Sequence, residues 1–137
     1  AAREANAEMP SYTVGVLKAA HGDLKGQTVV VLGAAYRGGV KETAFSGIFA
    51  TVDSLKSAGA TVLVHDPMYT DDELAHYGFT AYHLGESADA LVVQANHAEY
   101  KAVAASDFPG LKTVVDGRKF LDASKFAGVN FITLGVG

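Results

Sequence analysis

The run of β-branched and apolar residues TVVVL at Thr28–Leu32 constrains the fold more than any other feature of this sequence. A short apolar run without polar alternation is typical of a strand that is covered on both faces, as in a parallel sheet. Apolar residues then recur every three or four positions, which predicts a helix over Thr43–Ala58 that ends at Gly59. A second run, Thr61–His65, predicts another buried strand. Strand, helix and strand in this order predict a right-handed βαβ unit.

The remaining sequence continues this alternation of short strands and helices. Thr70 and Glu73 have the spacing of a capping box, which predicts a short helix through His76. We therefore expect an α/β domain with a Rossmann-like, doubly wound, mostly parallel sheet of about six strands and helices on both faces. The other expected strands are Phe79–His83, which is weak, Ala90–Gln94, Thr113–Val115 and Asn130–Leu134, and the other expected helical stretches are His97–Ala104 and Ala123–Ala127.

Composition narrows the class of protein. A chain of 137 residues with 49% apolar and 19% charged residues suits one folded domain and is not typical of disorder. A net charge of −4 argues against nucleic acid as the main partner. The absence of Cys excludes disulfide scaffolds, thiol enzymes and Cys-type zinc sites. Residues 1–10 lack the apolar core of a signal peptide, and no apolar run approaches the ~20 residues of a membrane span, so we expect a cytoplasmic protein without a membrane partner.

The candidate ligand site lies in the loops that follow the strands, because open parallel sheets bind ligands beyond their carboxyl ends. The loop after Leu32 contains glycines that let a ligand approach the backbone, followed by Tyr36 and Arg37, an aromatic face and a guanidinium that pairs with phosphate. Arg118 follows the strand Thr113–Val115 and projects from the same sheet edge. Two guanidinium groups in one crevice are costly without an anion between them. These residues favour a nucleotide diphosphate.

Other interpretations of these residues stay open. The glycines can serve only to turn the chain, Arg37 can be a solvated surface charge, and Arg118 can pair with Asp116. The loop lacks the GxGxxG fingerprint, and Asp66 lies 33 residues after Gly33, where that fingerprint expects about 20. An independent NAD site in this loop is therefore disfavoured.

The five histidines show no spacing typical of a metal site. His65 with Asp66, and His97 with Glu99, are candidates for part of an acid/base site, since His titrates near neutral pH. Strand-end histidines that bond to backbone or water are the favoured alternative.

Four motifs in order resemble the C-terminal, UDP-binding domain of the UDP-glucose/GDP-mannose dehydrogenase family. They are VLGAAYR at Val31–Arg37, VHDP at Val64–Pro67, ADALV at Ala88–Val92 and VVDGR at Val114–Arg118. The resemblance implies that Tyr36, Arg37 and Arg118 contact the UDP part of a UDP-sugar. It also implies that residues 1–24 form an N-terminal helical arm, which is the end of the central helix that leads from the dimerisation domain. The part that resembles this helix is Arg3–Pro10, with Asn6. Residues 25–137 then form the UDP-binding domain.

The activity implied by the resemblance is the four-electron oxidation of a UDP-sugar C6 alcohol to the uronic acid, with two NAD per turnover. In this family the catalytic Cys, its Lys and Asn helpers and the NAD-binding domain lie upstream. The resemblance thus implies no catalytic residue and no metal in this chain, NAD held mainly by an upstream domain, a homo-oligomeric full-length enzyme, and a fragment that is inactive alone.

The sequence also departs from the family pattern. The family's NAD-contacting arginine is replaced by Ala44 within Glu42–Gly47, with Lys41 nearby, and Arg37 stands where Lys is usual. The string YRGGVKET resembles a subgroup that acts on UDP-N-acetylhexosamines, N-acetylmannosamine in particular. Two other classes stay open: a non-catalytic interaction or regulatory module, in which the Ala-rich helix Arg3–Ala20, kinked or started near Pro10, is an interface, and a free-standing small dehydrogenase.

Overall fold

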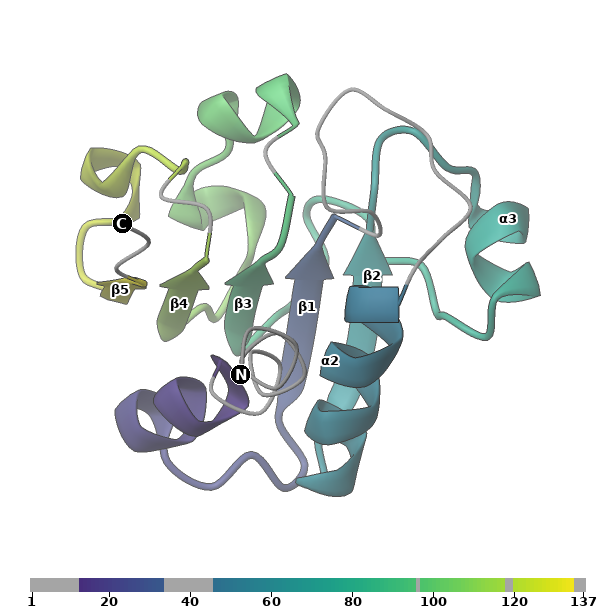
Figure 1. Cartoon of the computed structure of the whole chain (residues 1–137). Helices are drawn as coiled ribbons and strands as arrows, with labels where there is room; N and C mark the ends of the chain where they lie inside the picture. The colour runs from purple at the N-terminus through teal and green to yellow at the C-terminus, as the bar shows by residue number, and fades with distance from the viewer. Residues whose placement is uncertain (1–12, 34–45, 96, 118–119, 135–137) are drawn as a thin grey trace, which may run out of the picture.

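The computed structural model of the chain describes residues 13–33, 46–95, 97–117 and 120–134 (Figure 1). Five strands form one parallel sheet in the order β2-β1-β3-β4-β5, which confirms the predicted α/β, Rossmann-like class. The chain runs from β1 outward to β2 and then returns past β1 to β3, so the topological switch point lies between β1 and β3. The strands are β1 (Thr28–Leu32), β2 (Thr61–His65), β3 (Ala90–Val93), β4 (Thr113–Asp116) and β5 (Asn130–Thr133).

One face of the sheet is covered by two helices. Residues 13–21 are helical, and α2 (Ser46–Ser57) packs beside them in front of the sheet in Figure 1. Val29 and Val31 of β1 point into this layer, where they meet Leu17 and Leu55 from the two helices. The predicted end of α2 is confirmed, because Gly59 follows it with φ +92°, a conformation that glycine adopts without strain.

The opposite face is covered differently from the prediction. Val30 and Leu32 point into it, and the short helical stretches expected at His97–Ala104 and Ala123–Ala127 are 3₁₀ turns in the layer above them. The large side chains of Tyr100, Phe108 and Phe126 fill this layer, so little helix is needed to bury the strands. The turns are η1 (Ala98–Ala102), η2 (Ala105–Asp107) and η3 (Ala123–Phe126).

The short helix α3 (Asp71–His76) lies beyond β2 (Figure 1) and begins as predicted. The Thr70 hydroxyl accepts the backbone N–H of Glu73 at 3.1 Å, and the Glu73 carboxylate accepts the N–H of Thr70 at 2.9 Å. This reciprocal capping box satisfies two of the donors that a helix start leaves open.

The expected strand at Phe79–His83 does not form in the described part of the chain. Only an isolated bridge joins Val64 to Ala81. Tyr82 turns into the aromatic layer instead, where its hydroxyl donates to backbone carbonyl oxygens of Glu86 and Asp107. The sheet therefore has five strands where about six were expected. No helix in the described ranges is long and apolar enough to cross a bilayer.

Candidate functional site

Gly33, directly after β1, fixes how the chain is arranged at the carboxyl end of the sheet. Its φ is +103°, and its N–H donates to the carbonyl oxygen of His65 at 2.7 Å. A Cβ at this position would lie 2.4 Å from the Cβ and 2.8 Å from the backbone nitrogen of Ala95. The segment after β3 therefore crosses tightly over the end of β1. The close neighbour of Gly33 is thus Ala95 of the chain itself, whereas the glycines of this loop were expected from the sequence to admit a ligand.

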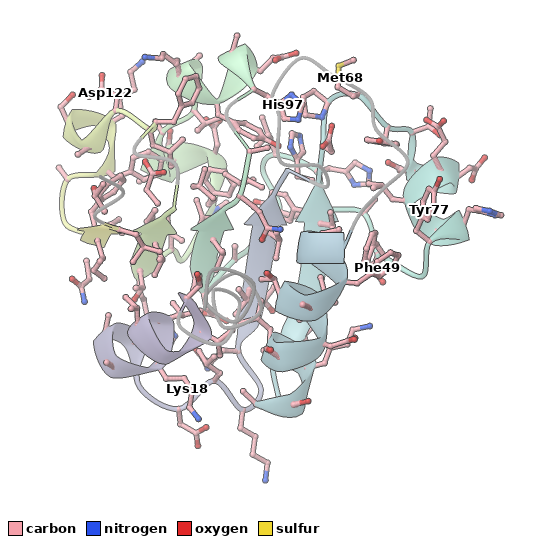
Figure 2. All side chains as sticks on the ribbon, viewed as in Figure 1. Lys18, Phe49, Met68, Tyr77, His97 and Asp122 are labelled. Carbon is pink, nitrogen blue, oxygen red and sulfur yellow. The ribbon has the colours of Figure 1, made fainter. Side chains whose placement is uncertain are left out.

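A buried pair ties this crossing segment to the end of β2. His97 Nε2 lies 3.1 Å from Asp66 Oδ2, and both side chains are fully buried. Asp66 Oδ1 also accepts the backbone N–H of Met68 at 2.8 Å. Figure 2 places the labelled His97 above the strand ends, on the opposite side of the molecule from Lys18. Since β1 lies between β2 and β3, the pair bridges the two loops that flank the end of β1.

This pairing was not among the sequence expectations, which placed His65 with Asp66 and His97 with Glu99. The signal was present, because Asp66 and His97 both follow strands whose carboxyl ends meet at one edge. The pairing of Asp66 with His97 could be predicted only from the strand order, which puts the loops after β2 and β3 within reach of each other. A carboxylate buried in this way serves to hold the loops and is closed to solvent.

His65 and Tyr100 form a second contact at the same edge. The Tyr100 hydroxyl lies 3.0 Å from His65 Nδ1 and donates to the His65 carbonyl oxygen at 3.0 Å. Burial lowers the pKa of His65 and outweighs the opposing effect of the Asp66 carboxylate, and burial raises the pKa of Tyr100. Both rings are therefore neutral at neutral pH.

The turn after β4 is fixed by the first two residues of the DGR string. Asp116 is buried, and its Oδ2 accepts the backbone N–H groups of Phe120 and Leu121, each at 2.8 Å. Gly117 donates its N–H to the carbonyl oxygen of Val93 at 3.1 Å, and a Cβ there would lie 3.0 Å from that oxygen. Asp116 and Gly117 thus have structural roles, and they hold the turn against the end of β3.

Three predicted UDP contacts, Tyr36, Arg37 and Arg118, lie outside the described residues, as do Lys41 and Ala44. Their roles stay predictions. The structure does show where the segments that carry them start: Gly33 ends β1 and Gly117 follows β4 at the same carboxyl edge, with the end of β3 between them.

The described residues do not fit NAD at this edge. In a dinucleotide-binding fold, an acidic residue at the end of the second strand accepts the ribose hydroxyls. The residue in the corresponding place is Asp66, whose carboxylate is buried and already bonded to His97 and Met68. The described residues also hold no group of three or more His, Asp or Glu side chains arranged to bind a metal ion.

Comparisons with known proteins point to one family. The profile described as "UDP-glucose/GDP-mannose dehydrogenase family, UDP binding domain" matches residues 30–123. UDP-N-acetyl-D-mannosamine dehydrogenase of Pyrococcus horikoshii is 30% identical over 145 residues, which cover 99% of this chain and 32% of that protein. UDP-glucose 6-dehydrogenase of Rhizobium meliloti is 30% identical over 105 residues, covering 73% of this chain and 23% of that protein.

A solved structure agrees with these sequence matches. The structure of UDP-D-ManNAc dehydrogenase from Pyrococcus horikoshii superimposes with a TM-score of 0.73 at 26% identity, over 96% of this chain and 32% of that one. The chain thus spans about a third or less of the length of the relatives that it matches. The matched range contains the carboxyl ends of β1 to β4, and on this basis the chain belongs to the UDP-glucose/GDP-mannose dehydrogenase family, within its UDP-binding domain.

Proposed function

We propose that this chain is the UDP-sugar-binding domain of an NAD-dependent nucleotide-sugar 6-dehydrogenase, which converts a UDP-sugar to the UDP-uronate with two NAD per turnover. The observation that carries the proposal is the family match, whose range includes the turns that leave β1, β2, β3 and β4 at one sheet edge. That edge is where open parallel sheets bind their ligands.

The uridine diphosphate is held by Tyr36, Arg37 and Arg118. The guanidinium groups pair with phosphate oxygens through charge-assisted hydrogen bonds, and the tyrosine offers its ring to the uridine. Asp116 supports this role by closing the turn from which Arg118 leaves, since its carboxylate bonds to backbone on the far side of Arg118. The chain contributes substrate binding and no catalytic residue.

The oxidation itself requires groups beyond those of this chain. The chain has no Cys to form a covalent intermediate, and Asp66 is unsuited to hold NAD ribose. NAD is bound mainly by another domain, and the 137-residue chain is inactive alone. Residues 1–24 join this domain to a central dimerisation region, which makes the complete cytoplasmic enzyme a homo-oligomer. Val14 and Leu17 pack into the same core as β1, which fixes the helix at residues 13–21 against the sheet.

The sugar that we propose is an N-acetylhexosamine, N-acetylmannosamine in particular. Support comes from the relative that matches nearly the whole chain, a UDP-N-acetyl-D-mannosamine dehydrogenase. The string YRGGVKET, which follows Ala35, also resembles the subgroup that acts on UDP-N-acetylhexosamines.

Calorimetric titration of the chain with UDP, UDP-N-acetylmannosamine, GDP and NAD tests the proposal. UDP and UDP-N-acetylmannosamine should bind to the chain, and NAD should not. Arg37→Ala and Arg118→Ala should each weaken UDP binding roughly tenfold or more, because a hydrogen bond to a charged group contributes about 1.5–3 kcal/mol. Lys18→Ala, at the opposite end of the molecule, is the control (Figure 2). A chain that does not bind UDP, or arginine variants that bind it like wild type, would contradict the proposal and favour the interaction module.

A further inference from the structure

The two ring nitrogens of His65 differ in their contacts with the described residues. Nδ1 faces the Tyr100 hydroxyl at 3.0 Å, and no residue in the described ranges bonds to Nε2. The ring is half-buried at the carboxyl end of β2, next to the end of β1. His65 therefore lies at the edge of the sheet where open parallel sheets bind their ligands.

The Tyr100 contacts favour one tautomer of His65. A phenol has a single proton, and here it points to the His65 carbonyl oxygen at 3.0 Å. With this proton directed to the carbonyl, the hydroxyl oxygen accepts from Nδ1, which favours the tautomer that is protonated at Nδ1. In the reverse tautomer the Tyr100 hydroxyl would have to donate to Nδ1. Its oxygen lone pairs would then face the His65 carbonyl oxygen, and the two oxygens would repel each other. A neutral imidazole with Nδ1–H leaves Nε2 as a bare acceptor.

Other contacts hold this arrangement in place. The carbonyl oxygen of His65 accepts a second hydrogen bond, from the Gly33 N–H at 2.7 Å, which fixes the backbone that carries the ring. Tyr100 is fully buried and packs edge-on against His97, which is in turn bonded to Asp66. The acceptor is thus preorganised before any ligand arrives, and little side-chain entropy is lost when it is used.

We propose that His65 is a nucleotide-contacting residue, whose Nε2 accepts a hydrogen bond from a donor on the uridine of the bound UDP-sugar. This inference rests on the proposed function and deepens it. Uridine offers two kinds of donor, the ribose hydroxyls and the imide N–H of the base, and both suit a neutral imidazole nitrogen. The ionised diphosphate offers no donor, so we assign it to the arginines and assign the His65 contact to the nucleoside.

Paired substitutions separate the two nitrogens of His65. In His65→Gln the side-chain amide reaches the place of Nε2 and retains an acceptor there, whereas in His65→Asn it reaches only the place of Nδ1. We expect UDP affinity to fall roughly fivefold in His65→Asn and to be largely retained in His65→Gln. His21→Asn is the matched control and should bind UDP like wild type, because both ring nitrogens of His21 are bonded within the chain.

Ligand analogues identify the donor. The analogues 2′-deoxy-UDP, 3′-deoxy-UDP and N3-methyl-UDP each lack one donor of UDP. One of them should bind the wild-type chain more weakly than UDP does, by the same factor by which His65→Asn weakens UDP binding. That analogue should lose nothing further when it is titrated into His65→Asn. A full additional loss with every analogue would show that His65 contacts none of these donors and would overturn the inference.

The tautomer is measured without ligand. Two-bond nitrogen-15 correlation spectra of the histidine-labelled chain should show Nδ1–H at His65, and Tyr100→Phe should shift this equilibrium. An Nε2–H tautomer in the wild-type chain, or unchanged UDP affinity in His65→Asn, would overturn the inference while UDP binding by wild type still supports the proposed function. If wild type does not bind UDP, the proposed function fails and the inference fails with it.

Discussion

Two histidines at opposite ends of the sheet show how differently the two ends are built. His21, at the end of the first helix, lies 2.7 Å from the Thr113 hydroxyl through Nδ1 and 2.9 Å from Gln27 Oε1 through Nε2. His65, at the carboxyl end, bonds through Nδ1 alone to a described residue. At the amino end both ring nitrogens of His21 hold the fold together, whereas at the carboxyl end Nε2 of His65 has no bond to a described residue, and we propose that it meets the nucleotide. Residue type alone does not distinguish the two roles.

The acidic side chains of the two ends differ in how deeply they are buried. At the amino end, Asp89 is half-buried and accepts the Thr28 N–H at 2.8 Å. At the carboxyl end, Asp66 is fully buried against His97 and holds two loops together. The carboxyl end thus combines a fully buried pair with a half-buried histidine whose Nε2 has no bond to a described residue.

The largest expected difference between the ends concerns two glycines with similar backbone angles. Gly33→Ala should cost about 4 kcal/mol of unfolding free energy, since the new Cβ would lie 2.4 Å from the Ala95 Cβ at a φ of +103°. Gly22→Ala at the amino end, where φ is +97° and nothing lies within 4 Å, should cost about 1 kcal/mol. Urea unfolding measures both. Equal losses would mean that the crossing over β1 is loose.

The next effect is the loss of the buried pair. His97→Leu should lower the unfolding free energy by about 3 kcal/mol, because the buried Asp66 carboxylate loses a donor. His21→Leu at the amino end should cost about 1 kcal/mol, since its partners are partly exposed and water replaces it. Thermal or urea unfolding of the two variants provides the comparison, and a smaller loss for His97→Leu would contradict it.

A smaller effect separates two buried tyrosines. Tyr100→Phe and Tyr82→Phe each remove a hydroxyl that donates to backbone carbonyl oxygen, and each should cost about 1 kcal/mol. Only Tyr100→Phe should alter the nuclear magnetic resonance titration of His65. A change of equal size in Tyr82→Phe would show that the effect spreads through the core and not through the hydroxyl.

The strands could be predicted well because their signal is local. Thr28–Leu32 and Thr61–His65 were predicted to the residue, since each is a β-branched run with a clear end, Gly33 after the first and Asp66-Pro67 after the second. The thin aromatic layer was not predicted, because whether Tyr100 and Phe108 fill a face depends on packing between distant segments. The pairing of Asp66 with His97 required the strand order, which local periodicity does not contain.

The smallest effects concern pH, where a buried and an exposed histidine shift in opposite directions. Burial lowers the pKa of His65 below its ordinary 6.5, whereas the hydrogen bond from exposed His83 to Asp71 raises the pKa of His83 above it. The His65 shift should therefore reduce stability as the pH falls below about 6.5, because the unfolded chain then binds the proton more readily. The His83 shift contributes stability at low pH that is lost as the pH rises through its raised value.

Proton titration by nuclear magnetic resonance checks both directions, and His83→Gln isolates the His65 effect in unfolding experiments. His65 should take up its proton at a lower pH than His83. The reverse order would mean that His65 is more solvated than the structure shows.

Mapping UDP binding onto the backbone amides tests the central claim most directly. On titration with UDP, the amide resonances of Gly33, His65 and Gly117 should shift, because they lie at the carboxyl end of the sheet. Those of His21 and Asn130, at the amino end, should stay in place. Shifts confined to the amino end, or none at saturating UDP, would contradict the assignment of the carboxyl end as the nucleotide site.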